Sequence, residues 1–263
     1  MYELMRAIFY SKIPHFNLVL FYDCMMGNLE TLFDLYMMTD YMVVAEHALP
    51  MNNLPAEEFF KAFAQSGTIE AACRQALKNI PLEWEKGYDF LGTQWNGDFK
   101  LIRSSEMEGL IEPSEMLASR LQELYPTMHE QLDSAMVHTY QANNRTGLYD
   151  FADYAHKVAE MTGDQQLQEI AQMIDEVFNK MIIARREVHG GSYGDIPQFT
   201  LSVVLKGQET YEKMTDYGYT FGEAYEYTNW HLFTNWGQWL KTNQQEPKDQ
   251  TDEFLGQPVG QAM

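Results

Sequence analysis

Cys24 is the residue whose type and position best suit covalent chemistry. It follows the apolar run NLVLFY (residues 17–22) and precedes the turn MMGN, whose Asn28 favours the start of a helix. A cysteine near the carboxyl end of a buried strand lies where open α/β sheets place ligands and catalytic groups. The positive end of the following helix favours a thiolate over a thiol. The sequence therefore predicts a nucleophilic Cys24, and it leaves an inert buried cysteine open as the alternative.

A cysteine nucleophile needs a base, normally a histidine that lies close in space. His189 in VHGGSYGD resembles a catalytic histidine at a strand end, but we favour a surface turn because the two glycines serve a bend. His47 follows the second apolar run and suits pocket lining better than base catalysis. His15 lies at the opposite end of the first strand. The remaining histidines, in helical or aromatic surroundings, are His129, His138, His156 and His231.

Other reactive residue types form no informative pattern. Cys24 and Cys73 are too few for a disulfide framework or a structural zinc site, and they could form one bridge or none. Cys73 lies among apolar residues at helical spacing in TIEAACRQALKN, which is typical of a small buried hydrophobic residue. No zinc or calcium ligand spacing, P-loop or dinucleotide fingerprint is present. We therefore expect no metal and no cofactor.

The segments around Cys24 predict an α/β fold. NLVLFY and DYMVVAE are apolar runs of strand length, and the LETLFDLY segment between them repeats its apolar residues at helical spacing. This order of strand, helix and strand predicts a parallel pair with a right-handed crossover. Asp23 would face away from Cys24 if the strand pleat continued that far. Upstream, YELMRAIFYSK predicts a helix that Pro14 ends.

The rest of the chain alternates predicted helices with short strands. AEEFFKAFAQ predicts an amphipathic helix with Phe59, Phe60 and Phe63 directed inward. The Asn-Gly pair at positions 96 and 97 predicts a hairpin or an exposed turn before a strand. Residues 104–134 are expected to be largely helical, and the TGD motif separates two further helices. FTLSVVLKG predicts a strand, and an aromatic-rich helical segment precedes a polar tail.

The acidic composition argues against nucleic acids and anionic membranes as binding partners. The chain has 263 residues and 38 acidic against 18 basic residues, which gives a net charge of −20. This charge would repel DNA, RNA and anionic lipid. No apolar stretch reaches the roughly 18 residues of a membrane span. The N-terminus also lacks the features of a secretory signal, so we expect either a cytoplasmic chain or a numbering that begins after a removed segment.

The segment FNLVLFYDCMMGNLETLFDLYMMTDYMVVAEHALPMNNLP resembles the nucleophile region of the clostripain-like cysteine peptidases, which belong to the caspase-like clan. GLYDFADYAHKV, TLSVVL and NWHLFTNWGQWLKTN are similar, in order, to the distal half of that family. The resemblance covers most of residues 2–245. It implies a caspase-like α/β fold, a mostly parallel sheet flanked by helices, with the N-terminal strands missing. Residues 1–245 would form an incomplete peptidase domain, the large fragment, and residues 246–263 a loose tail.

The resemblance also implies roles for individual residues. Cys24 would attack a peptide carbonyl, and its backbone N–H would help to hold the oxyanion. The residues expected to contact substrate are Tyr22, Asp23, Glu46, His47 and Asn52. Many family members cleave after Arg or Lys with the help of two acidic pocket residues. The matching positions here carry Tyr22 and a residue near Asn52, so neither supplies the fixed negative charge that this preference requires.

The family's catalytic histidine precedes the helix that matches YELMRAIFYSK, and this chain starts at that helix. The resemblance therefore implies a cysteine endopeptidase large fragment whose base lies on an upstream segment, carried by a smaller partner chain. We expect the isolated chain to be inactive. The alternative is a truncated or decayed homologue that acts in binding or as a scaffold. Export from the cytoplasm and a response to calcium are implied by the resemblance alone.

Overall fold

The computed structural model describes residues 10, 15–47, 56–79, 96–143, 147–189, 200–205, 212, 214, 218 and 220–243. A four-stranded sheet has the order β1 (Phe16–Leu20), β2 (Thr39–Val44), β3 (Asn96–Arg103) and β6 (Ile182–His189). A three-stranded sheet has the order β4 (Gln141–Asn143), β5 (Leu148–Asp150) and β7 (Ser202–Val204). The expected domain boundary at 245 and the tail at 246–263 lie outside the described residues, so both stay predictions.

Strand pairing confirms the predicted parallel unit around Cys24. β1 and β2 are parallel, with Phe16 opposite Thr39 and Leu20 opposite Val43. β3 pairs antiparallel with both β2 and β6, and β5 pairs antiparallel with both β4 and β7. The predicted α/β class is confirmed, and the described part of the main sheet is mixed. An isolated parallel bridge between Asn28 and Ser202 connects the end of the Cys24 segment to β7.

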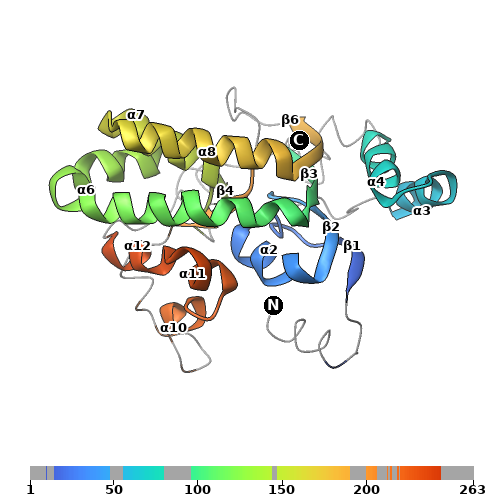
Figure 1. The fold of residues 1–263 in the computed structure, drawn as a ribbon, viewed down its shortest axis with the longest axis horizontal. Coiled ribbons are helices and arrows are strands. Elements are labelled where there is room, and N and C mark those ends of the chain that lie inside the picture. The colour runs from blue at the N-terminus through green and yellow to red at the C-terminus, as the bar shows by residue number, and fades with distance from the viewer. Residues whose placement is uncertain are drawn as a thin grey trace, which may run out of the picture.

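Helices cover the sheets and extend beyond them (Figure 1). Early in the chain these are α2 (Leu29–Leu35), the 3-10 segment η1 (Tyr36–Met38), α3 (Ala56–Gln65) and α4 (Ile69–Lys78). The middle of the chain forms η2 (Ser104–Leu110), α6 (Ile111–His138), α7 (Phe151–Thr162) and α8 (Gln165–Met181). The last helices are α10 (Phe221–Tyr225), α11 (Asn229–Thr234) and α12 (Trp236–Thr242). α6, α7 and α8 stack together, and α3 with α4 lies at the opposite end of the molecule.

Local signals explain where several helices begin and end. Asn28, Asp150 and Asp164 each accept a hydrogen bond from a first-turn backbone N–H of α2, α7 and α8, respectively. Gly163 ends α7 with a φ of 68°, a left-handed conformation that glycine adopts without steric cost. The predicted break between α7 and α8 at TGD is therefore confirmed.

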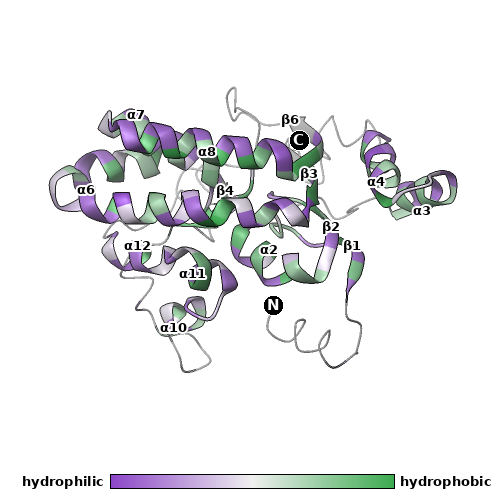
Figure 2. Ribbon diagram, viewed as in Figure 1, coloured by the Kyte–Doolittle hydropathy of each residue, from purple (hydrophilic) through white to green (hydrophobic). Residues whose placement is uncertain are grey.

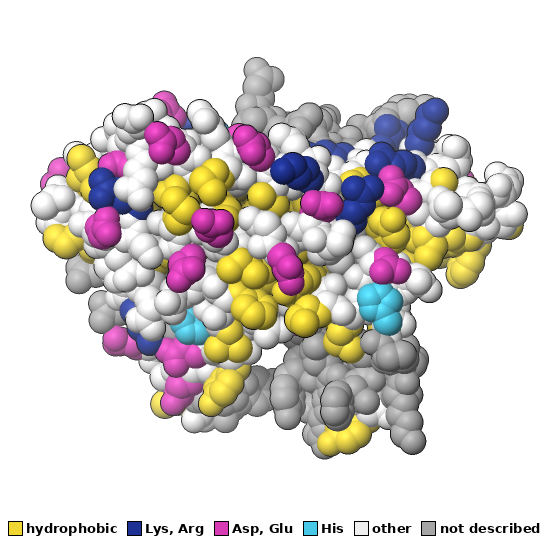
Figure 3. Space-filling view, viewed as in Figure 1, with side chains coloured by type: hydrophobic (Ala, Val, Ile, Leu, Met, Phe, Trp, Pro, Cys, Tyr) yellow, Lys and Arg dark blue, Asp and Glu magenta, His cyan; other side chains and the backbone are white. Residues whose placement is uncertain are grey.

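The main hydrophobic core joins α2 to the long helices and to the C-terminal helices. Trp230 is fully buried, and its ring centroid lies 4.9 Å from that of Phe33 on α2 and 5.6 Å from that of Phe151 on α7. Figure 2 shows hydrophobic and hydrophilic residues alternating along α6, α7 and α8, as expected of amphipathic helices that bury one side. Acidic side chains are spread over the face drawn in Figure 3. Among the described helices, none combines the length and apolarity that a membrane crossing requires.

Two local predictions are wrong. Phe59 is buried, but Phe60 is 73% exposed, because neighbouring residues point in different directions from a helix axis and α3 buries Phe59 and Ala62. Asn96 and Gly97 do not form a hairpin turn. They lie within β3 opposite His189 and Val188 of β6, which is distant in sequence. The strand predicted to follow them is confirmed.

Candidate active site

Cys24 lies in residues 21–28, the segment that connects β1 to α2 and that we call the cysteine turn. The strand ends at Leu20, so its pleat does not reach Cys24, and Asp23 is exposed rather than placed on an opposite strand face. Cys24 is half-buried and Cys73 is fully buried. These two cysteines are not joined by a disulfide.

Two backbone hydrogen bonds fix the cysteine turn to the residues that follow β2. The N–H of Met25 donates to the carbonyl of His47 at 3.1 Å, and the N–H of Gly27 donates to the carbonyl of Ala45 at 2.7 Å. The turn therefore takes its position from the carboxyl end of its parallel neighbour strand. This is the edge at which open α/β sheets place functional groups.

The backbone next to the cysteine is held in an uncommon conformation. Met25 has a φ of 59°, in the left-handed region that a residue with a side chain rarely adopts. Asn28 supports it, since its side-chain amide donates to the Met25 carbonyl at 2.7 Å. The same side chain accepts from the N–H of Thr31 at 2.8 Å and so caps α2. One residue therefore secures both the turn and the start of the helix.

Close backbone packing explains the glycine in the turn. A Cβ added at Gly27 would lie 2.9 Å from the backbone nitrogen of Glu46 and 3.0 Å from the carbonyl carbon and oxygen of Ala45. On its other side, the Gly27 carbonyl accepts from the N–H of Ser202 at 3.0 Å. The turn is thus packed between the end of β2 and the start of β7.

A buried polar cluster lies beside the same end of β2. Asp98 Oδ1 on β3 accepts from the backbone N–H groups of Glu46 and His47, each at 3.1 Å. It also lies 2.5 Å from Nδ1 of His47, whose Nε2 lies 2.5 Å from the hydroxyl of Tyr140. Lys100 donates to Asp98 and, at 3.2 Å, to Oε2 of Glu46. We call these five residues the β2-end cluster.

Burial and charge set the protonation of the β2-end cluster. Burial raises the pKa of Glu46 well above its usual range, and its Oε1 lacks a hydrogen-bond partner among the described residues. Burial alone would also raise the pKa of Asp98, but the charges of Lys100 and His47 outweigh this effect and hold that pKa far below its usual range. The cluster therefore holds an ionised Asp98–Lys100 pair beside a Glu46 carboxyl whose protonated form burial favours.

Three potential metal ligands occur in this cluster. Ligand atoms of Glu46, His47 and Asp98 all lie within 4.8 Å of one another. However, the Lys100 ammonium donates to both carboxylates and already supplies the positive charge between them. This arrangement disfavours a metal ion at the same position, because two cations would compete for the same oxygens.

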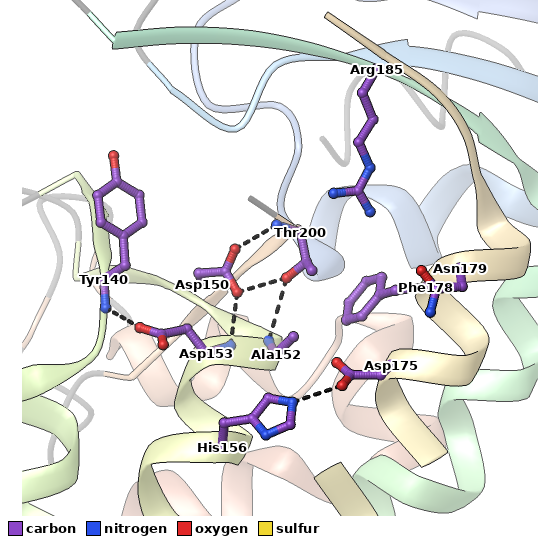
Figure 4. Close-up of a pocket in the computed structure, with 10 residues that line it drawn as sticks. All are labelled: Tyr140, Asp150, Ala152, Asp153, His156, Asp175, Phe178, Asn179, Arg185 and Thr200. Carbon is purple, nitrogen blue, oxygen red and sulfur yellow. Dashed lines mark hydrogen bonds and ion pairs between the residues drawn. The ribbon is translucent and has the colours of Figure 1, made fainter. Parts of the chain in front are cut away.

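A cavity of about 490 Å³ borders the cluster (Figure 4). Its lining residues are Tyr140, Asp150, Ala152, Asp153, His156, Asp175, Phe178, Asn179, Arg185 and Thr200. Buried Asp150 accepts from the N–H and hydroxyl of Thr200 at 2.6 and 2.7 Å, and Figure 4 shows Arg185 extending from β6 towards the cavity. Tyr140 therefore belongs both to the lining of the cavity and to the β2-end cluster, where its hydroxyl contacts His47.

The structure places the expected site residues in two groups. Tyr22 and Asp23 are exposed within the cysteine turn, whereas Glu46 and His47 are buried in the β2-end cluster. Asn52 lies outside the described residues. Several histidines contact groups elsewhere: His15 bonds to Asp40, His156 bonds to Asp175, and His231 accepts from the N–H of Gly237. His189 lies at the end of β6, opposite Asn96.

Sequence reasoning missed Asp98, Lys100 and Tyr140. Asp98 and Lys100 alternate with Phe99 and Leu101 along β3, a pattern typical of a strand with one solvated face. Here the four residues are all buried. An acid and a base two positions apart in a strand share a face, which is the one signal that could have indicated a buried ion pair.

Comparisons with known proteins agree with this geometry. No curated protein matches the chain, but the model of the clostripain family matches residues 1–242. Among solved structures, a Bacteroides fragilis cysteine protease is 15% identical with a TM-score of 0.60, over 89% of this chain and 92% of its own. A clostripain from Bacteroides thetaiotaomicron, in complex with a peptide inhibitor, is 17% identical with a TM-score of 0.59, over 88% and 92%.

A secreted cysteine protease from B. thetaiotaomicron, iotapain, is 17% identical with a TM-score of 0.57. The match covers 88% of this chain and 58% of that one. These likenesses confirm the caspase-like α/β fold. The family match extends over most of the chain and includes both the cysteine turn and the β2-end cluster, and the chain therefore belongs to the clostripain family.

Proposed function

We propose that this chain is the large fragment of a cysteine endopeptidase and that the Cys24 thiolate is its nucleophile. The observation that carries this proposal is the cysteine turn itself. Backbone bonds from Met25 and Gly27 fix it at the carboxyl end of β2, and a capped helix follows it. Family membership supports peptides or proteins as the substrate class.

The proposed chemistry is acyl transfer. The thiolate attacks the carbonyl carbon of a peptide bond, and the backbone N–H of Cys24 helps to stabilise the oxyanion. Collapse of the tetrahedral intermediate releases the amine and leaves a thioester, which water then hydrolyses. A base must take the thiol proton and return it to the leaving amine.

We assign that base to a histidine on an upstream segment carried by a smaller partner chain. The backbone carbonyl of His47 is hydrogen-bonded to Met25 of the turn. However, the ring of His47 is buried and contacts Asp98 and Tyr140. His15 and His156 are engaged by other carboxylates. These contacts support a base from elsewhere, and the isolated chain is then expected not to turn over.

Substrate contacts are proposed for Tyr22, Asp23, Glu46, His47 and Asn52. Because Tyr22 stands where many relatives carry an aspartate, we expect no strict preference for cleavage after Arg or Lys. Burial of Glu46 and His47 supports a role beneath the substrate rather than in direct contact with solvent. Secretion is proposed from the secreted relative iotapain. Any response to calcium is an analogy with the family.

The alternative is a non-catalytic homologue that binds peptides or acts as a scaffold, and the substitution at Tyr22 favours it. The test begins with the rate of Cys24 alkylation by iodoacetamide from about pH 5 to pH 10, compared with glutathione in parallel. Cys24→Ala gives the background from Cys73, whose pKa burial raises to about 12.

The decisive step is to co-express the chain with an upstream His-Gly segment from a relative and to assay a mixed fluorogenic peptide library. The peptidase proposal predicts hydrolysis that disappears in Cys24→Ala and in a variant of the added histidine. Glutathione-like alkylation together with no hydrolysis in the reconstituted pair would favour the non-catalytic alternative.

A further inference from the structure

The β2-end cluster connects β3 to the cysteine turn, and the chemistry above gives its Asp98 and Lys100 no part. We propose that Asp98 is a positioning residue that holds residues 45–47 in the conformation that anchors the cysteine turn. The importance of this conformation for reactivity rests on the proposed role of Cys24. The anchoring itself is a statement about the fold and can be tested separately.

Asp98 takes the place of a missing strand partner. The β2–β3 ladder ends with Val44 opposite Lys100, so the next backbone N–H groups of β2 have no ladder carbonyl. The carboxylate of Asp98 instead accepts from the N–H groups of Glu46 and His47, each at 3.1 Å. A buried N–H without an acceptor is costly, and an ionised acceptor gives a stronger bond than a neutral one. One side chain therefore fixes two consecutive peptide groups.

The first of these peptide groups carries the contact directly to the turn, because its N–H donates to Asp98 and its Ala45 carbonyl accepts from Gly27. The carbonyl of His47, in the peptide group that follows these two, accepts from Met25 of the turn. Met25 has a left-handed φ of 59°, which is strained for a residue with a side chain. Such a conformation persists only where its surroundings restrain it. Movement of residues 45–47 would therefore release the turn next to Cys24.

The charged neighbours allow Asp98 to act as an anion in the core. Lys100, which is also fully buried, donates to it and compensates its charge. Because an ionised Asp98 can only accept, Nδ1–H of His47 donates to it, and Nε2 of the same ring is hydrogen-bonded to the Tyr140 hydroxyl. The ring of His47 is thus held from both sides, and so is the backbone to which it is attached.

The test is amide hydrogen exchange in the Asp98→Asn variant of the full chain. The amides of Met25 and Gly27 should exchange at least tenfold faster than in the wild type, because their acceptors lose a fixed position. The pH profile of Cys24 alkylation should shift towards that of glutathione. Asp164→Asn is the matched control, since Asp164 caps α8 and pairs with Arg120 away from the turn. Asp164→Asn should lower the stability by a similar amount but leave the exchange of the Met25 and Gly27 amides and the alkylation of Cys24 unchanged.

If Asp98→Asn does not fold, the pair Asp98→Asn and Lys100→Met removes the uncompensated ammonium as well, and the same measurement applies. A folded variant with wild-type exchange at Met25 and Gly27 would overturn the inference. Equal acceleration in the Asp164→Asn control would also overturn it, because the effect would then be global. Faster exchange at these two amides in Asp98→Asn, when Cys24 of the wild-type chain already alkylates like glutathione, would uphold the positioning role and contradict the proposed function.

Discussion

Gly27 determines how closely the cysteine turn approaches β2. The atoms that a Cβ would meet, at 2.9 and 3.0 Å, belong to the backbone of residues 45 and 46 and not to mobile side-chain ends. Among these backbone atoms, the Ala45 oxygen accepts the bond from Gly27 that holds the turn, and the Glu46 nitrogen donates to Asp98. A side chain at position 27 would therefore separate the turn from its support, whatever its polarity.

We predict that Gly27→Ala lowers the free energy of unfolding by about 1–3 kcal/mol, as overpacking at a rigid site does. It should also change the rate of Cys24 alkylation, because the turn must shift. Urea unfolding and iodoacetamide kinetics measure the two effects. Gly67→Ala is the control, since a Cβ there would meet nothing within 4 Å. Equal stability of the two variants would contradict the close approach at Gly27.

At the level of elements, α2 begins where the cysteine turn ends, and both depend on Asn28. Its side chain accepts from the N–H of Thr31 and donates to the carbonyl of Met25. The two interactions are separable, because an aspartate retains the acceptor and lacks the donor. Variants at this position can therefore distinguish the stability of the helix from the restraint of the turn.

We predict that Asn28→Ala lowers the free energy of unfolding by about 1 kcal/mol or more, through loss of the helix cap. Asn28→Asp should keep most of that stability but still alter Cys24 alkylation, since the bond to the Met25 carbonyl is lost. Thr68→Ala removes the cap of α4, which accepts from the N–H of Ala71 at 3.2 Å. This control should lower stability without an effect on Cys24. Unchanged alkylation in both Asn28 variants would mean that the turn does not need this side chain.

The elements also show what the sequence could predict. The β1–α2–β2 unit and the boundaries of α7 and α8 were predicted because apolar spacing and caps such as Asn28 and Gly163 act within a few residues. The β2-end cluster was not, because Asp98 lies 51 positions and Tyr140 93 positions from His47. The antiparallel pairing of β3 with β6 was missed for the same reason. Only tertiary packing shows that Asp98 and Lys100 face a buried neighbour and not solvent.

For the whole molecule, α2 joins the start of the chain to its last helices. Glu30 accepts from the N–H of Val204 on β7 at 3.0 Å and from the hydroxyl of Tyr225 on α10 at 2.7 Å. One turn further along, Asp34 accepts from the N–H of Asn229 at the start of α11. A buried carboxylate and a half-buried one thus connect α2 to segments that lie 174 and 195 positions further along the sequence.

This connection should make stability depend on pH. Burial raises the pKa of Glu30, although the bonds from Val204 and Tyr225 partly oppose it, and Oε2 of Glu30 has no hydrogen-bond partner among the described residues. Below the unfolded-state value of about 4.3, the carboxyl is protonated in both states. As the pH rises, the unfolded chain loses this proton first, so the stability gained from the neutral group is lost as the pH passes through the raised folded-state pKa.

We therefore predict that Glu30→Gln, which has no proton to lose, becomes more stable relative to the wild type as the pH rises from about 4 to 8. Each unit by which the folded pKa is raised corresponds to about 1.4 kcal/mol of this difference. Urea unfolding at several pH values measures it, and the difference between variants removes the contributions of other buried acids such as Glu46. Glu115→Gln, on the exposed side of α6, is the matched control. A trend for Glu30→Gln in the opposite direction would mean that the hydrogen bonds from β7 and α10 outweigh burial and that this junction prefers an ionised Glu30.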